Sequence, residues 1–202
     1  MNQDDRETEA KFYIRDLKKL VARVSNLGAN LTQNRTYEIN LRFDNSQEDL
    51  QRAHQVLRLR QDKTAYLTYK GSGQQIEGMI TRQEIEVGVD DFETARRLVE
   101  ALGFRVIFIY EKYRSIYASA DALIMIDELP YGNFIEIEGD WTNIPRLARQ
   151  LNLKWENAIA SSYFALFECA RNELDLTFRD LTFANFANLT VSPENLGVQP
   201  AD

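Results

Sequence analysis

The chain has little of several residue types on which secreted proteins and common enzyme classes depend. Among its 202 residues Cys169 is the only cysteine, so no internal disulfide can form and neither secretion nor a zinc site of Cys/His type is indicated. His54 is the only histidine, and no partner that would orient its ring can be identified, so we interpret it as structural. No Ser-His or Cys-His nucleophile can therefore be argued, and no glycine-rich phosphate loop occurs.

Long apolar runs are absent as well. No segment approaches the roughly 20 apolar residues that span a bilayer, and the first twenty residues are charged and lack a signal-peptide core. These features predict a cytoplasmic protein. Acidic residues outnumber basic ones by 31 to 24, and the resulting net charge of −7 disfavours nucleic acid or an anionic membrane as the main partner. A cationic cavity stays compatible with this total, because the placement of charge matters more than its sum.

Alternation of apolar and polar residues predicts short strands, and apolar residues at helical spacing predict helices between them. The expected strands cover residues 6–13, 35–44, 56–60, 66–70, 80–87, 106–110, 113–117, 123–127 and 134–138. The expected helices cover 15–27, 90–102, 142–151 and 160–174, with Asp90 or Asp91 and Thr142 as caps and Gly28 and Gly103 as stops. Residues 1–174 are expected to form one domain, and 175–202 a C-terminal extension that is partly helical and then disordered.

A short internal repeat favours closure of these strands into a barrel. Glu7 and Glu9 precede Gly28 by about one strand and one helix, and Glu84 and Glu86 precede Gly103 in the same way. Two such halves would supply about eight strands, and eight strands can enclose one small ligand. The expected fold class is α+β, a closed eight-stranded, mainly antiparallel β-barrel with helices packed outside.

Charged residues occupy every second position in seven stretches of these strands. Successive side chains of a strand point to opposite faces, so the charges of each stretch share a face. The set comprises Glu7, Glu9, Lys11, Arg58, Arg60, Lys70, Arg82, Glu84, Glu86, Lys112, Arg114, Asp127, Glu136 and Glu138. Periodicity alone leaves two orientations open, a face wetted by solvent or the lining of a lumen. The apolar residues between the charges need cover, which helices outside a barrel can give; they are Leu57, Leu59, Leu67, Ile85, Val87, Ile135 and Ile137.

In a lumen the two signs of charge would have separate tasks. Arginine and lysine match phosphate oxygens, and the arginine fork can bind two at once. Paired carboxylates repel phosphate but bind Mg²⁺ or Mn²⁺, hard cations that bridge to phosphate oxygens. Phosphoryl or nucleotidyl transfer could then proceed by positioning and electrostatic stabilisation, without a covalent nucleophile.

Six motifs occur in an order that is typical of a known family. They are Glu7-x-Glu9-x-Lys11, Leu57-Arg58-Leu59-Arg60, Leu67-Thr68-Tyr69-Lys70, Arg82-x-Glu84-x-Glu86, Glu111-Lys112-x-Arg114, and Asp127 followed by Gly132-Asn133-Phe134-Ile135-Glu136-Ile137-Glu138. Over about residues 6–140 they resemble the CYTH, or triphosphate tunnel metalloenzyme, superfamily. The stretch from Glu111 to Tyr117 and Ser162-Tyr163-x-x-Leu166 look like its class IV adenylyl cyclase branch. Arg42 and Asp44 depart from the family's second-strand pattern and receive no role.

The resemblance implies a tunnel that binds a small triphosphate (ATP, tripolyphosphate or thiamine triphosphate) together with Mg²⁺ or Mn²⁺. Glu7, Glu9, Lys11 and Arg114 would be catalytic. The implied phosphate-binding residues are Lys11, Arg58, Arg60, Lys70, Arg82, Lys112 and Arg114. The implied metal candidates are Glu7, Glu9, Glu136 and Glu138, with Glu84, Glu86 and Asp127 supporting or sharing that role. A homodimer is compatible with such a barrel, although no sequence feature demonstrates one.

Three functions stay open. The first, favoured by the branch motifs, is conversion of ATP to cyclic AMP and pyrophosphate, in which the metal would activate the ribose 3′-hydroxyl. The second is hydrolysis of inorganic, nucleoside or thiamine triphosphate, in which the metal would hold a water. The third is a non-catalytic polyphosphate or nucleotide sensor, and the carboxylate pairs weigh against it because a pure binder could rely on its cations.

Overall fold

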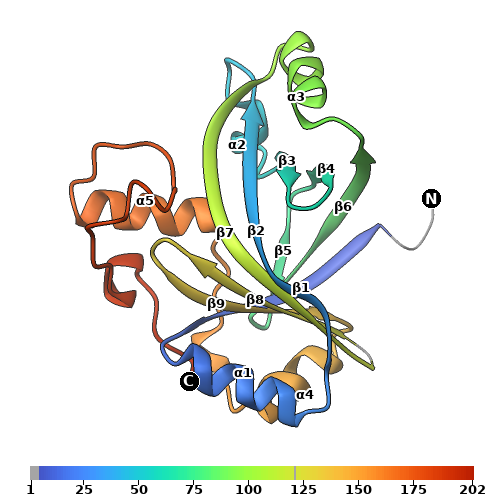
Figure 1. The fold of residues 1–202 in the computed structure, drawn as a ribbon, viewed down its shortest axis with the longest axis vertical. Coiled ribbons are helices and arrows are strands. Elements are labelled where there is room, and N and C mark those ends of the chain that lie inside the picture. Colours follow the sequence, from blue (N-terminus) through green and yellow to red (C-terminus); the bar gives the residue numbers. More distant parts are fainter. Residues whose placement is uncertain (1–4, 121) are drawn as a thin grey trace.

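The computed structural model describes residues 5–120 and 122–202, and its main feature is a ring of antiparallel strands (Figure 1). Within these residues eight strands follow one another in the order β1, β9, β8, β7, β2, β3, β4 and β6, and β6 pairs with β1. The strands are β1 (Arg6–Ile14), β2 (Asn30–Asp44), β3 (Val56–Gln61), β4 (Ala65–Lys70), β5 (Gln74–Ile76), β6 (Met79–Val89), β7 (Arg105–Ser119), β8 (Ala122–Leu129) and β9 (Gly132–Gly139). The ring confirms the predicted α+β class and eight-stranded barrel. Its closure is uneven, because β1 meets β6 only over Arg6–Glu9, whereas β2 and β7 pair along most of their length.

Helices cover the outside of the ring at three places. They are α1 (Leu17–Asn26), α2 (Asp49–Arg52), α3 (Phe92–Ala101), α4 (Asn143–Gln150) and α5 (Tyr163–Glu173), with 3₁₀ turns at Trp155–Asn157 and Pro193–Leu196. In Figure 1, α1 and α4 lie together at one end of the molecule, α3 lies at the other, and α5 lies to one side. None of the helices in the described ranges is long and apolar enough to cross a membrane.

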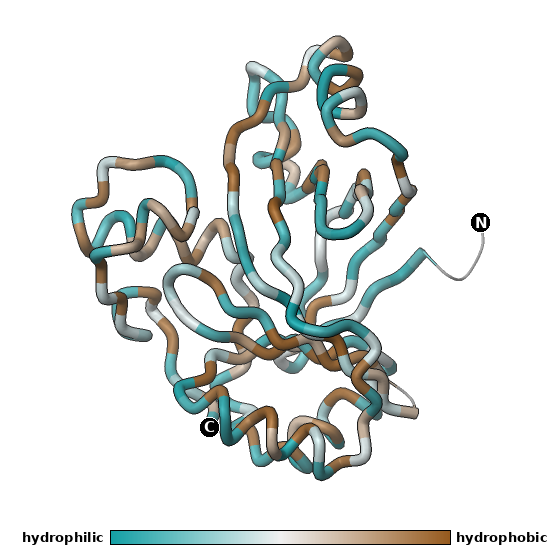
Figure 2. Tube along the Cα trace, viewed as in Figure 1, coloured by the Kyte–Doolittle hydropathy of each residue, from teal (hydrophilic) through white to brown (hydrophobic). Residues whose placement is uncertain are grey.

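Alternation along the strands separates the core from the ring's interior. Ile135 and Ile137 of β9 are fully buried outside the ring, against Leu20 of α1 and Leu147 of α4. On the opposite side of the fold, Leu59 of β3 belongs to a smaller core that includes residues of α3. Figure 2 shows the same alternation as hydrophobic and hydrophilic segments that follow one another along the strands. Burial of these apolar faces leaves the charged positions pointing inward.

The predicted repeat appears as two units, β1–α1–β2 and β6–α3–β7. The Asp16 carboxylate caps α1 by accepting a hydrogen bond from the Lys19 backbone N–H at 2.9 Å, and the Asp91 carboxylate caps α3 in the same manner. Gly28 and Gly103 follow these helices with φ of 73° and 95°, a conformation that glycine adopts without steric cost. Thr142 precedes α4, but its side chain makes no capping hydrogen bond, contrary to the sequence interpretation.

Two strands are longer than predicted. The stretches 106–110 and 113–117 belong to one continuous strand, β7, and β2 begins at Asn30 instead of residue 35. The sequence reading placed a break at Glu111–Lys112, yet the two-residue period continues through Tyr110, Lys112 and Arg114, which all face the interior. The two-residue period therefore predicts the extent of β7 better than the charged residues Glu111 and Lys112 do.

The C-terminal segment 175–202 is packed on the barrel, although its end was expected to be frayed. Leu181 exchanges backbone hydrogen bonds with Ile109 and Glu111 of β7, each at 2.9 Å. At the end of the chain, the Ala201 N–H donates to the Tyr13 carbonyl at 3.0 Å, and the Asp202 carboxylate accepts from the N–H groups that precede α1. The segment is ordered by these backbone bonds and by burial of apolar side chains such as Leu181.

Cover of the ring is incomplete on β6. Ile85 and Val87 were expected under a helix, but their side chains are 48% and 57% exposed. The nearest helix in sequence, α3, packs mainly on β3, β4 and β7.

Candidate active site

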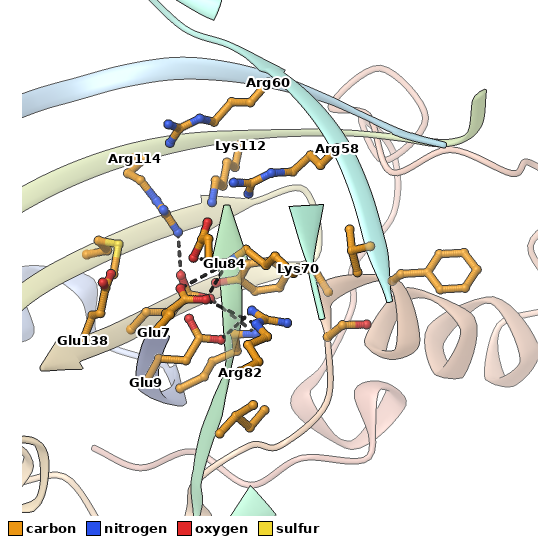
Figure 3. A pocket seen from close by; sticks show the side chains of 18 of the residues that line it. Glu7, Glu9, Arg58, Arg60, Lys70, Arg82, Glu84, Lys112, Arg114 and Glu138 are labelled. Carbon is orange, nitrogen blue, oxygen red and sulfur yellow. Dashed lines mark hydrogen bonds and ion pairs between the residues drawn. The ribbon is translucent and has the colours of Figure 1, made fainter. Parts of the chain in front are cut away.

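The charged strand positions converge in one cavity of about 390 Å³ inside the ring. Every charged residue predicted from the sequence lines this cavity except Asp127, which is fully buried behind it. The lumen is therefore the charged face, and the solvated orientation is wrong. We call this cavity the tunnel. Figure 3 shows basic side chains reaching into it from one wall, Arg60, Lys112 and Arg114 among them, toward Glu7 and Glu9 on the opposite wall.

Asp127 of β8 anchors the cations of β7. Its carboxylate accepts hydrogen bonds from Lys112 Nζ at 3.0 Å, from Arg114 Nε at 2.6 Å and from the Tyr163 hydroxyl at 2.9 Å. Arg114 pairs with Asp127 across the β7–β8 ladder, so the strand register itself brings the two together. Both oxygens of Asp127 accept hydrogen bonds from these donors, so Asp127 holds the two cations in position.

Glu136 of β9 lies among cations in the same way. It pairs with Lys11 at 3.3 Å and accepts a hydrogen bond from Arg114. Burial opposes its ionisation, but Lys11 and Arg114 outweigh burial and hold the pKa of Glu136 well below its ordinary value. Lys11 also donates to the Ser161 carbonyl at 3.3 Å and lies 4.2 Å from the centroid of the Tyr163 ring. The loop before α5 thus contributes directly to the tunnel wall.

A second ion-pair group joins β1, β4 and β6. Lys70 Nζ lies 2.7 Å from Glu7 and 3.1 Å from Glu84. Arg82 bridges Glu7 and Glu9, with its Nε and terminal nitrogen each 3.2 Å from a carboxylate oxygen. Antiparallel pairing of β1 with β6 and of β6 with β4 places these side chains in one layer.

A third group lies on β3, β4 and β6. Arg60 and Arg58 lie 3.2 Å and 3.7 Å from the two oxygens of Glu86. Thr68 donates to Glu86 at 2.7 Å and accepts from Arg58 at 3.3 Å. The Nε atoms of both arginines are buried without a hydrogen-bond partner. Because unpaired buried donors are costly, this wall retains binding capacity for an anion.

Glu9 and Glu138 are the two carboxylates of the tunnel whose pKa values are raised, although Arg82 pairs with Glu9 at 3.2 Å. Burial, together with repulsion from Glu7 and Glu136, raises the pKa of Glu9. Burial, together with repulsion from Glu7, Glu84 and Glu9, raises the pKa of Glu138 to about 7. Carboxylates that repel one another in this way form a donor set suited to a hard divalent cation. Within the described ranges no three acidic, histidine or cysteine side chains are gathered closely enough to hold a metal in their present arrangement.

Sequence reasoning missed two charged residues of the second strand. Glu38 is almost fully buried, pairs with Lys112 at 3.4 Å and lies 3.8 Å from Arg60. Burial opposes its ionisation, but Lys112, Arg114, Arg58 and Arg60 lower the pKa of Glu38 to about 2. Arg42 also lines the tunnel. Both lie at alternate positions of β2, and this alternation was the signal that could have assigned them.

A second cavity, of about 620 Å³, adjoins the tunnel at Leu123 and Glu138, which line both. Trp141, which is 40% exposed, lines this cavity, and Gln74 and Ser119 are among the other lining residues. We call it the side cavity. A flat aromatic ring beside amide and hydroxyl groups is a surface on which a heterocyclic base could stack and form hydrogen bonds.

Comparison with known proteins agrees with this geometry. The family model of the CYTH domain matches residues 5–163. A protein of Methanocaldococcus jannaschii named "putative adenylate cyclase" is 30% identical over 173 residues, which are 79% of this chain and 97% of that protein.

Solved structures share the fold. An X-ray structure of a "putative adenylate cyclase" from Vibrio parahaemolyticus superposes with a TM-score of 0.70 at 22% identity, over 80% of this chain and 97% of that one. The structure of a Pyrococcus horikoshii OT3 protein superposes with a TM-score of 0.67 at 25% identity, over 78% of this chain and 96% of that one. The structure of a Hippeastrum protein, described as a "putative adenylyl cyclase" with a dominant triphosphatase activity, superposes with a TM-score of 0.61 at 19% identity. The match covers 80% of this chain and 95% of that one.

Proposed function

Because the chain belongs to the CYTH domain family, we propose that it is a divalent-metal-dependent enzyme that converts ATP to cyclic AMP and pyrophosphate inside its tunnel. The observation that carries this proposal is the convergence of buried cations and mutually repelling carboxylates on one cavity inside the ring of strands. Cations of this kind match a triphosphate, and the carboxylates match a metal that accompanies it.

The basic residues would grip the phosphates. Lys11, Arg58, Arg60, Lys70, Arg82, Lys112 and Arg114 all line the tunnel. Asp127 holds Lys112 and Arg114 in place, so their charges are oriented before a substrate arrives. Such preorganised cations stabilise charge that develops on a leaving pyrophosphate without reorganising during the reaction.

Glu7, Glu9 and Glu138 are the residues that would hold the divalent cation. Family membership implies a dependence on such an ion, and the raised pKa values of Glu9 and Glu138 support this choice among the acidic residues. When bound, Mg²⁺ or Mn²⁺ would supply charge neutralisation at the reacting phosphorus and acidify the attacking hydroxyl. Glu84, Glu86 and Glu136 pair with cations in this structure, as Glu7 and Glu9 also do, and would support or share that role.

The side cavity supports a nucleotide as substrate. A triphosphate that fills the tunnel can extend its organic group past Leu123 and Glu138 toward Trp141. In the cyclase reaction the ribose 3′ oxygen loses its proton and bonds to the α-phosphorus, while the bond from that phosphorus to the pyrophosphate oxygen breaks. The name of the M. jannaschii relative agrees with this reaction.

Hydrolysis is the alternative. The same cations and carboxylates could direct water to a phosphorus atom, and a dominant triphosphatase activity is described for the Hippeastrum protein. A non-catalytic polyphosphate or nucleotide sensor is a weaker alternative.

The test is product analysis with two substrates. The protein is incubated with Mn²⁺ or Mg²⁺ and either ATP or tripolyphosphate, and the products are separated by chromatography. Cyclic AMP with pyrophosphate supports the cyclase, orthophosphate supports hydrolysis, and binding without turnover supports the sensor. Glu9→Gln should abolish turnover, whereas Glu48→Gln, an exposed control on the outside, should not change it. Full activity of Glu9→Gln would contradict the metal assignment.

A further inference from the structure

Arg42 differs from the other cations of the tunnel. Within the described residues, each of the other basic side chains that line it lies within 4.0 Å of a carboxylate oxygen, whereas Arg42 makes no ion pair and no side-chain hydrogen bond. Its guanidinium instead lies 5.0 Å from the centroid of the Phe164 ring, in the first turn of α5. Arg42 is thus a tunnel cation with an unused fork of donors.

A second arginine lies beside it. Arg42 of β2 is directly opposite Arg58 of β3 in the ladder, and both side chains face the tunnel. Burial, and the charges of Arg82 and Arg58, lower the pKa of Arg42. Two guanidinium groups on adjacent strands repel each other unless an anion lies between them, and a phosphate can accept a fork from each.

The opposite end of the tunnel carries the opposite unpaired charge. Among the described side chains Glu138 has no hydrogen-bond or ion-pair partner, and it borders the side cavity. Figure 3 shows Arg58 and Glu138 well apart, with Glu138 at the left edge of the view. The tunnel is therefore polarised, with an unpaired cation toward α5 and an unpaired carboxylate toward Trp141.

We propose that Arg42, together with Arg58, binds the terminal phosphate of the substrate and thereby fixes the direction in which the triphosphate lies. The terminal phosphate would point to α5, and the α-phosphate and the organic group would lie toward Glu138 and the side cavity. This inference rests on the proposed function, and it adds the orientation of the substrate and a phosphate-binding residue on β2. The leaving pyrophosphate of the cyclase reaction would then remain on the arginine side.

Calorimetric titration with ATP and ADP tests this orientation, because ADP lacks the terminal phosphate. In Arg42→Ala the Kd for ATP should rise roughly 10- to 100-fold, the effect of losing a charged hydrogen-bonding partner. The Kd for ADP should change by less than about threefold. The Kd of Arg42→Lys for ATP should lie between those of wild type and Arg42→Ala, because lysine keeps the charge and lacks the forked donors of arginine. Arg52→Ala, at a well exposed arginine of α2, is the matched control and should bind both nucleotides as the wild type does.

Thermal melting separates binding from a structural role. Without ligand, Arg42→Ala should melt at or above the wild-type temperature, because the variant loses a half-buried cation that has no acidic partner. A structural role predicts a lower melting temperature for both Arg42→Ala and Arg42→Lys, and that result would overturn the inference. If the wild type turns over ATP, an unchanged ATP affinity in Arg42→Ala would also overturn the inference. An equal loss of ATP and ADP affinity in that variant would do the same. A wild type that binds and converts no triphosphate would overturn the proposed function as well.

Discussion

Replacing Asp127 by asparagine tests the claim that this residue holds the tunnel's cations in place. The substitution keeps the shape of the side chain and removes its charge. Lys112, Arg114 and Tyr163 all donate to this carboxylate, which has no exposed surface. Asparagine offers one acceptor oxygen in place of two, and its NH₂ group would face donors.

The magnitude follows from the partners that remain. Breaking a buried ion pair typically costs about 3–5 kcal/mol, because the other charge is left buried. Lys112 would keep Glu38 at 3.4 Å, and Arg114 would keep Glu136, so the lower end of that range applies. We expect the free energy of unfolding to fall by about 3 kcal/mol. For a chain of this size the melting temperature should fall by roughly 6–12 °C.

The assay is urea unfolding followed by circular dichroism, with scanning calorimetry for the melting temperature. Asp90→Asn, at an exposed aspartate before α3, is the matched control. Its free energy of unfolding should lie within about 0.5 kcal/mol of that of the wild type. Tripolyphosphate should restore part of the stability that Asp127→Asn loses, since it supplies negative charge to the freed cations. A variant as stable as wild type would refute the role of Asp127 as the anchor of Lys112 and Arg114.

Three further predictions concern other residues of the tunnel and the side cavity. The low pKa of Glu38, about 2, means that its stabilising contribution is present above about pH 4.5 and is lost as the pH falls toward 2. The stability gap between wild type and Glu38→Gln should therefore narrow from pH 5 to pH 2 in urea titrations, and a constant gap would contradict this. Trp141→Ala should raise the KM for ATP several-fold and leave that for tripolyphosphate unchanged in rate assays; equal effects would argue against a base site in the side cavity. Tyr163→Phe removes a hydroxyl that donates a hydrogen bond to Asp127 at 2.9 Å. In urea titrations it should lower the free energy of unfolding by about 1.5–3 kcal/mol, and a change below about 0.5 kcal/mol would contradict the importance of this hydrogen bond.

The sequence predicted the ring and most of the tunnel lining because a strand's two-residue period directly encodes which side chains share a face. Glu7, Glu9 and Lys11 illustrate this, since their alternation placed all three on one face, while the choice between a solvated face and a lumen stayed open until the structure. Glu38 and Arg42 follow the same period in β2, but Arg42 lies in a stretch that departs from the family's pattern, and Glu38 belongs to none of the recognised motifs. Their surroundings come from β3 and β7, whose register no local pattern specifies.

The C-terminal segment could not be predicted for a different reason. Its contacts with the barrel include backbone hydrogen bonds between positions far apart in sequence, such as Leu181 with Ile109 and Ala201 with Tyr13. Backbone groups are the same for nearly every residue type, so they leave no signature in the sequence. Apolar residues of the segment such as Leu181 and Phe186 are buried in the structure, but the sequence does not specify the part of the barrel against which they pack.

Charge balance in the tunnel explains why a triphosphate and a divalent cation would bind together. Among the described residues that line it, eight side chains are basic and six are acidic, and two further carboxylates, Glu38 and Asp127, lie in contact with the cations. The tunnel of a chain with net charge −7 is thus close to neutral, because nearly every cation is already paired. An entering triphosphate must take cations from Glu7, Glu9 and Glu136, and the carboxylates so released would be left buried without partners. A divalent cation offsets that loss at the same moment, so each ligand lowers the free-energy cost of binding the other.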